Sequence, residues 1–147
     1  MPFQQYAHSR WLQDFPQWAG LREDHGVDIC YSIASPANPL HILWVVFTPD
    51  EILIKFAVPG SHEHYDPDDY LFHNQDLSES VAWDSTYQNA IEEYVQPVLE
   101  DRMVIVNHGN HQTITCDVEE FAKLNKLSSF HYESWSRPAV AFSAAAS

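Results

Sequence analysis

Hydrophobic positions recur along the chain with two periods, one typical of helices and one typical of strands. Between residues 8 and 25, Trp11, Phe15 and Trp18 fall at three- and four-residue spacing, which predicts an apolar helix face. Pro16 interrupts this pattern, because proline lacks an N–H and its ring clashes with the preceding turn. We therefore expect a helix that breaks or kinks near Phe15 and ends at Gly26.

Three strands are expected next. Residues 27–35 alternate between apolar and polar side chains, and residues 40–47 are apolar enough to be buried on both faces. Residues 48–51, Thr-Pro-Asp-Glu, have the composition of a turn, and residues 52–58 return as a strand. Residues 40–58 therefore predict an antiparallel hairpin.

The second half begins with an irregular stretch. Residues 59–80 predict a long loop with a short strand at 70–72, and loops of this length are often functional. A helix capped by Asp84 or Ser85 is expected to run to residue 99. Two strands, 103–107 and 112–116, and a helix over 117–127 capped by Asp117 complete the pattern.

This order of elements predicts an α+β fold. Hairpin-linked strands with helices at the periphery indicate a mainly antiparallel sheet of about five strands with three or four helices. The 147 residues, 45% of them hydrophobic, fit a single domain, which we place at residues 1–142. Residues 143–147 are expected to fray.

Targeting signals and cysteines indicate the expected compartment of the protein. The N-terminal residues have no signal-peptide pattern, and the longest apolar run, residues 42–47, is far shorter than the ~20 residues of a membrane helix. Cys30 and Cys116 form no C-x-x-C pair, which favours a reduced cytoplasmic chain, although one bridge between them stays an alternative.

The charge of the chain is the feature that says most about its partner. The chain has 21 Asp and Glu against 7 Lys and Arg, a formal net charge of −14. Such a protein repels nucleic acid and anionic membranes and attracts basic surfaces. No Lys or Arg lies between Lys55 and Arg102, and within this segment acidic residues alternate with aromatic ones. The expected partner-binding residues are Asp66, Asp68, Asp69, Asp76, Glu79 and Asp84, with Tyr65, Tyr70 and Trp83 as anchors.

Two other readings of these residues remain open. The acidic segment can be an ordinary solvated surface with its aromatic side chains in the core. His62, His64 and Asp66, completed by His108 and His111, can instead form the metal site of a hydrolase. The H-x-H-x-D pattern resembles the start of the metallo-β-lactamase motif, but Pro67 and Asp68 follow where that motif has Asp-His. We favour a polar loop there and expect neither a metal nor a cofactor.

Nucleophilic catalysis is not favoured. Neither cysteine has a local catalytic signature, and the sequence holds no G-x-S-x-G and no glycine-rich phosphate loop. The adjacent acids Glu92-Glu93 and Glu119-Glu120 point about 100° apart on a helix, so they do not converge on one substrate.

The order and length of the elements over residues 6–127 resemble the immunity proteins of bacterial contact-dependent growth inhibition and related polymorphic toxin systems. The similar parts are Trp11-Leu12 in the first helix, the strand over 28–35, the hairpin over 42–56, the helix over 87–99, a strand after it and the helix start over 115–121. The resemblance implies a small cytoplasmic protein without enzymatic activity that binds and blocks a basic toxin domain, often a nuclease. An acidic regulator that mimics nucleic acid is an alternative with the same electrostatics.

Overall fold

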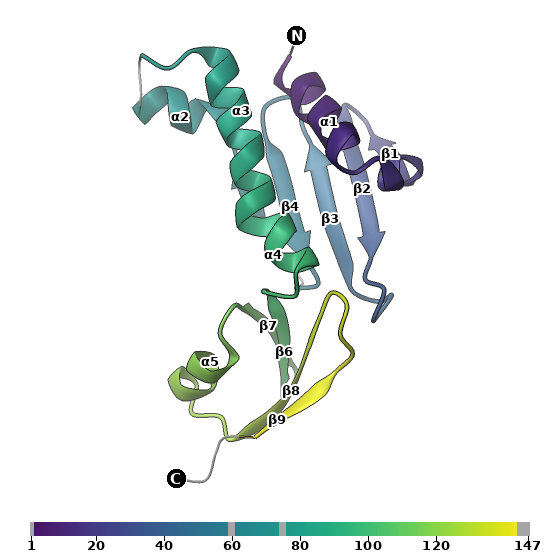
Figure 1. Ribbon diagram of the computed structural model, residues 1–147, viewed down its shortest axis with the longest axis vertical. Coiled ribbons are helices and arrows are strands. Elements are labelled where there is room, and N and C mark those ends of the chain that lie inside the picture. Colours follow the sequence, from purple (N-terminus) through teal and green to yellow (C-terminus); the bar gives the residue numbers. More distant parts are fainter. Residues whose placement is uncertain (1, 59–60, 74–75, 144–147) are drawn as a thin grey trace.

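The fold consists of two antiparallel sheets with helices packed beside them (Figure 1). The computed structural model describes residues 2–58, 61–73 and 76–143. The first sheet has the strand order β1-β2-β3-β4-β5 and the second has the order β7-β6-β8-β9. The strands are β1 Arg22–His25, β2 Asp28–Ala34, β3 Ile42–Phe47, β4 Ile52–Phe56, β5 Glu63–Tyr65, β6 Val104–His108, β7 His111–Thr115, β8 Ser129–Ser134 and β9 Val140–Ser143.

The helices lie at the periphery, as the sequence predicts. They are α1 Phe3–Asp14, the 3-10 turn η1 Pro16–Leu21, α2 Pro67–His73, α3 Glu79–Ala90, the π turn η2 Ile91–Val95, α4 Gln96–Leu99 and α5 Val118–Leu124. The α+β class and the single domain are confirmed. The described residues form more than the expected five strands. The first sheet alone has five strands, and the second sheet adds four.

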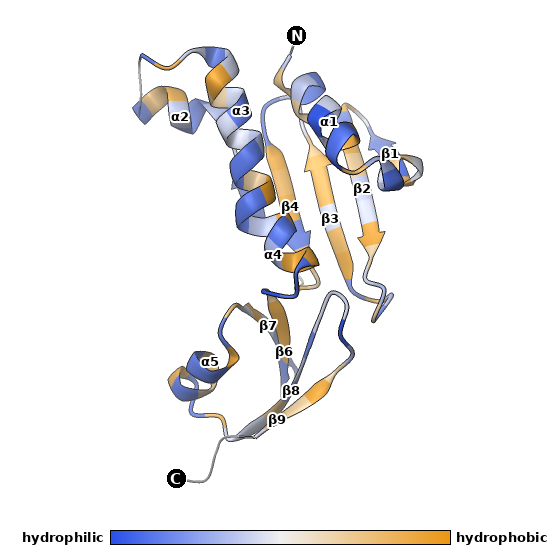
Figure 2. Cartoon of the chain, in the orientation of Figure 1, coloured by the Kyte–Doolittle hydropathy of each residue, from blue (hydrophilic) through white to orange (hydrophobic). Residues whose placement is uncertain are grey.

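The main core lies between the first sheet and the helices α1 and α3 (Figures 1 and 2). Alternate residues of β3 and β4 point into it, including Leu43, Val45 and Ile54, each at most 1% exposed. From α1, the fully buried Trp11 packs against Tyr31 and other aromatic rings. Burying each such side chain contributes about 2 kcal/mol.

The first helix breaks where the sequence predicts. α1 ends at Asp14, and η1 starts at Pro16. The expected helix over 8–25 was wrong at both ends, however, because α1 already begins at Phe3 and residues 22–25 form β1. All four residues of β1 are exposed on this edge strand, so they carry no apolar pattern.

The irregular stretch over 59–80 contains more structure than expected. Residues 63–65 form β5, and residues 70–72 lie in α2 rather than in a strand. Asp66 accepts the amide of Asp68 at 2.8 Å and so satisfies a free N–H in the first turn of α2. The expected caps Asp84 and Ser85 were also wrong, because α3 begins at Glu79 behind Ser78, whose hydroxyl accepts the amide of Val81.

The second sheet begins with the two expected strands. The β6–β7 hairpin turns at residues 109–110, and Asp117 caps α5 by accepting the Glu120 amide at 3.0 Å, as predicted. Strands β8 and β9 were not predicted. Ser143, placed in the fraying tail by the sequence, pairs with Ser129, while residues 144–147 lie outside the described residues.

The second sheet has a small core of its own with α5, and it joins the main core through Ile105 and Trp135, beside a polar junction. Trp135 contacts the Phe56 ring with centroids 5.8 Å apart, and the Ser35 hydroxyl donates to the Trp135 carbonyl at 2.6 Å. Beside them lies the buried pair His41 and Glu133, with His41 Nε2 3.4 Å from Glu133 Oε1. These contacts join the sheets into one domain.

Two further expectations concern thiols and membranes. Cys30 is buried and Cys116 is exposed, and both are free thiols. Among the described residues, no helix combines the length and the apolar character that crossing a membrane requires.

Candidate partner-binding groove

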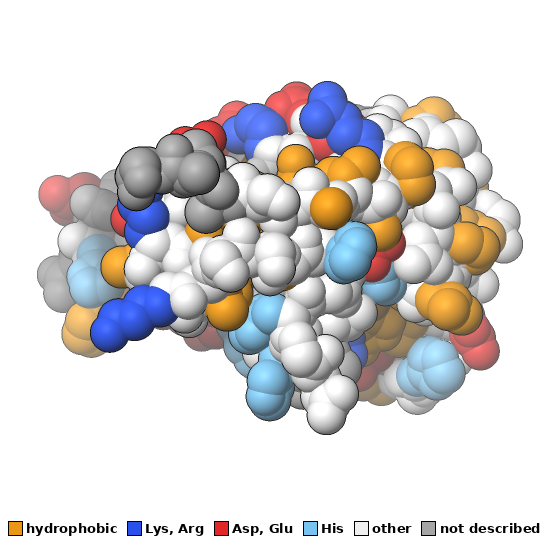
Figure 3. Space-filling view, turned by 90° about the horizontal axis from the view of Figure 1, so that it is seen from below, with side chains coloured by type: hydrophobic (Ala, Val, Ile, Leu, Met, Phe, Trp, Pro, Cys, Tyr) orange, Lys and Arg blue, Asp and Glu red, His pale blue; other side chains and the backbone are white. Residues whose placement is uncertain are grey.

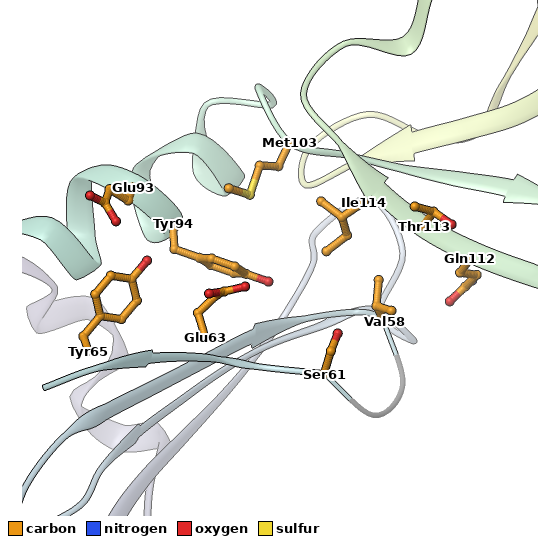
Figure 4. A pocket seen from close by; sticks show the side chains of 10 residues that line it. All are labelled: Val58, Ser61, Glu63, Tyr65, Glu93, Tyr94, Met103, Gln112, Thr113 and Ile114. Atoms are coloured by element: carbon orange, nitrogen blue, oxygen red, sulfur yellow. The ribbon is translucent and has the colours of Figure 1, made fainter. Parts of the chain in front are cut away.

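Two adjoining hollows form a groove along the free side of β5, and they share Tyr65 and Glu93. The first hollow, of about 600 Å³, lies between β5, η2 and β7 (Figure 4). The second, of about 420 Å³, lies between β5, α2 and α3. The first is lined by Val58, Ser61, Glu63, Tyr65, Glu93, Tyr94, Met103, Gln112, Thr113 and Ile114. The second is lined by His64, Tyr65, Asp66, Asp69, Tyr70, His73, Asn89 and Glu93.

The π turn η2 supplies the centre of the groove. Glu93 and Tyr94 of this turn both line the first hollow, whereas the neighbouring Glu92 does not. The Tyr94 ring points toward Glu63, and Glu93 lies near Tyr65, at the end of the hollow away from β7 (Figure 4). Tyr94 is fixed there because its hydroxyl accepts the backbone N–H of Phe56 at 3.1 Å. Single π turns inside helices occur frequently at functional sites.

Tyrosines line the floor of the groove. Burial raises the pKa of Tyr65, and the nearby carboxylates of Glu93 and Glu63 raise it further. Burial likewise raises the pKa of Tyr70, with added contributions from Glu93 and Asp69. Both hydroxyls therefore stay protonated at neutral pH and can donate hydrogen bonds.

Four carboxylates surround these tyrosines: Glu63, Asp66, Asp69 and Glu93. The pKa of Asp66 is raised, first by burial and then by the negative charges of Asp68, Asp69 and Glu51, against a lowering by the Asp68 amide. No Lys or Arg lines either hollow among the residues that the structure describes. Apart from His64 and His73 of the second hollow, the described lining therefore holds no side chain that can neutralise these carboxylates.

The net charge lies entirely on the part of the chain that builds this groove. Residues 102–147 hold four acidic side chains and four Lys or Arg, so the formal charge of −14 belongs to residues 1–101. The view from below, onto the second sheet, shows Lys and Arg side chains at its rim and only small patches of Asp and Glu (Figure 3). The charge is therefore unevenly distributed: residues 1–101 carry the net negative charge, and the charges of residues 102–147 balance.

The structure brings together four of the nine residues that the sequence assigned to partner binding. Tyr65, Asp66, Asp69 and Tyr70 all line the second hollow. A further three, Asp68, Asp76 and Glu79, are exposed but do not line either hollow.

The other two residues have structural roles. Trp83 is not an exposed anchor, because it packs against the core and contacts the rings of Phe3 and Tyr6. Asp84 is not a free carboxylate, because it forms an ion pair with Arg10 of α1. Both lie inside α3, on the side that packs against α1.

Glu63, Glu93 and Tyr94 were missed as groove residues. From the sequence, Glu92 and Glu93 were expected to be a pair of solvated acids on a regular helix. A π turn has no sequence signature that would place one of the two acids in the groove. Gln112, Thr113 and Ile114 were missed because only the folded chain brings the edge of the second sheet beside η2.

The histidines of the metal hypothesis form two separate pairs. His62 and His64 lie together, with ring centroids 4.5 Å apart, and His64 Nδ1 is 3.0 Å from a Glu51 oxygen. His108 and His111 belong to the second sheet, at the turn of its β6–β7 hairpin. In residues 2–58, 61–73 and 76–143, no group of three or more His, Cys, Asp or Glu side chains is placed to hold a metal ion.

Comparison with known proteins adds no family to this description. The chain matches no protein-family model, and no curated protein or solved structure shows significant similarity to it. The groove, its charge and its position in the fold are therefore the observations from which a function can be inferred.

Proposed function

We propose that this chain is an acidic inhibitor protein that binds a basic protein partner through the groove. The observation that carries the proposal is a groove with four carboxylates, three tyrosines and no Lys or Arg among its described lining residues. An isolated acidic cluster on a flat surface would be ordinary solvated charge. Here the acids surround a hollow with aromatic walls, which is a shape that can bury a partner's side chain.

The chemistry of the groove suits a Lys or Arg side chain. Each carboxylate within about 4 Å of such a cation attracts it by about 4 kcal/mol before desolvation is subtracted. Tyr65, Tyr70 and Tyr94 supply apolar ring surface for the aliphatic part of the side chain, and tyrosine hydroxyl oxygens can accept the N–H groups of the cation. The net charge of −14 steers a basic partner toward this side of the molecule.

Inhibition would follow from competition. A basic surface that binds nucleic acid does so mainly through its contacts to phosphates, and carboxylates that occupy those contacts exclude the substrate. Together with the resemblance in element order, this supports the role of an immunity protein that acts in the cytoplasm on a nuclease toxin. The chain itself would need no catalytic group and no cofactor for this role.

The proposal is tested with the product of the gene immediately upstream, because toxin and immunity genes are expected to be neighbours. That product is expressed in bacteria with and without this chain, and growth and complex formation are measured. We expect growth arrest that the intact chain relieves, and weaker relief by a Glu63→Gln/Glu93→Gln variant. Glu92→Gln is the matched control, since it removes a charge from the same turn outside the groove. An upstream product that neither arrests growth nor binds would overturn the immunity role.

A further inference from the structure

We infer that the partner contributes an extended basic segment that adds a strand to the free edge of β7, beside the first hollow. This inference rests on the proposed function and specifies how the partner would bind. It names one occupant, a β-strand with Lys or Arg at alternate positions. Binding of this kind uses backbone hydrogen bonds for affinity and alternate side chains for specificity.

The lining of the hollow indicates that the edge of β7 borders it. Successive side chains of a strand point to opposite sides, so a sheet face contributes only every second residue. β5 behaves in this way, because Glu63 and Tyr65 line the first hollow and His64 between them does not. β7 instead contributes three consecutive residues, Gln112, Thr113 and Ile114 (Figure 4).

The hairpin register identifies the backbone groups at that edge. His108 and His111 flank the two-residue turn, so they are the hydrogen-bonded pair that closes it. Because hydrogen-bonded and non-hydrogen-bonded pairs alternate in an antiparallel ladder, Thr113 points its N–H and C=O toward β6. Gln112 and Ile114 point theirs away from β6, toward the hollow. Within the described residues no backbone or side-chain partner is recorded for these outward groups.

The edge of β7 also lacks the features that protect a sheet edge. Natural edge strands are usually blunted by charged side chains, proline, bulges or a covering element. β1, the edge strand of the first sheet, carries Arg22, Glu23 and Asp24. β7 reads His-Gln-Thr-Ile-Thr, with neither proline nor a Lys, Arg, Asp or Glu.

Charge decides which occupant fits this edge. A strand added to β7 would lie about 5 Å from it, in the hollow whose lining also includes Glu63 of β5 and Glu93 of η2. These two carboxylates favour Lys or Arg among its side chains. The opposite edge of the second sheet, β9, borders a hollow lined by Lys123 and Lys126, so it does not favour a basic segment.

The test uses the full chain, labelled for NMR, and a short capped peptide of sequence Thr-Lys-Val-Lys-Val-Lys-Thr. Two further peptides carry backbone N-methyl groups, one at the lysines and the other at the valines. Only one set of N–H groups of an added strand faces β7, so we expect one methylated peptide to lose roughly tenfold or more in affinity and the other to bind nearly as well as the parent. The amides of Gln112 and Ile114 should become protected from exchange when the parent peptide binds.

A variant of the protein gives a second readout. Gln112→Pro and Gln112→Ala both lose the hydrogen bond from Gln112 Nε2 to Asn107 Oδ1 and keep the backbone ladder to β6, but only the proline variant also loses the outward N–H. The proline variant should therefore bind roughly tenfold more weakly than the alanine variant. Equal binding of all three peptides, with dependence on Glu93 retained, would overturn strand addition and leave the proposed function standing. Failure of the parent peptide to bind at low salt would overturn both.

Discussion

The carboxylate of Asp84 on α3 pairs with the guanidinium of Arg10 on α1 and also accepts the Tyr6 hydroxyl at 2.9 Å. Arg10 also lies over the Tyr87 ring, with its guanidinium carbon 4.9 Å from the ring centroid. This contact ties the first helix to the helix that leads into the groove. Arg10 is therefore paired within the chain, as Arg22, Arg102 and Arg137 also are, and its partner is an acid that the sequence alone assigned to a binding surface.

Asp84→Asn should destabilise the fold by about 1 kcal/mol at neutral pH, because the pair is half exposed and partly screened by solvent. Hydrogen bonds from Arg10 and Tyr6 lower the pKa of Asp84 below its usual 3.8. A lowered pKa in the folded state contributes stability above the unfolded pKa, and that contribution is lost as the pH falls through the folded value. Urea unfolding should therefore show the difference from wild type at pH 7 and its disappearance as the pH falls through the lowered pKa of Asp84.

A double-mutant cycle with Arg10→Gln controls for other effects of the substitution. Arg10→Gln also loses the contact with the Tyr87 ring, so it should cost more than Asp84→Asn. The double change should cost clearly less than the sum of the two single changes, because both remove the same ion pair. Fully additive costs would contradict the pair as a stabilising contact.

The polar junction between the sheets gives a second prediction. Glu133 is buried and accepts amide hydrogens from Asn38 at 3.2 Å and Asn107 at 3.1 Å, while facing His41. Glu133→Ala leaves these donors without an acceptor in the interior and should cost about 3 kcal/mol. Glu133→Gln keeps one acceptor oxygen and should cost clearly less. Thermal and urea unfolding measure both, and equal stability of the alanine variant and wild type would refute the junction's role.

The third prediction concerns the support of the groove. Tyr94→Phe removes the acceptor of the Phe56 N–H and should cost about 1–2 kcal/mol, with faster amide exchange at Phe56. Tyr132→Phe is a suitable control, because Tyr132 lies in β8, far along the chain from the groove. A Phe56 amide whose exchange stays unchanged would mean that Tyr94 does not fix the π turn on β4.

Much of this architecture can be predicted from the sequence because it follows simple periodicity. The hairpin over β3 and β4 has near-continuous apolar strands around a Pro-Asp turn, and α5 has a strong cap in Asp117. The break after α1 follows directly from Pro16. Each of these signals depends on neighbouring residues alone.

The missed elements depend on tertiary contacts instead. In β8, Glu133 occupies a buried position, so the strand lacks an apolar pattern, and its burial is explained only by Asn38, Asn107 and His41 from elsewhere in the chain. Only part of the groove could be predicted, for the same reason. Tyr65 and Asp66 belong to one acidic segment, but Glu93 reaches them only because η2 packs beside β5.

The central claim is that the groove, and not the overall negative charge, binds a basic partner. The most direct measurement is the affinity of the capped Lys-alternating peptide for two variants, Glu93→Gln and Glu92→Gln, by titration at low salt. Both variants lose one charge from the same turn, so long-range attraction is weakened equally. We predict a loss of roughly tenfold for Glu93→Gln, which faces the groove, and less than about twofold for Glu92→Gln. Equal losses for the two variants would contradict a specific groove and leave only diffuse charge.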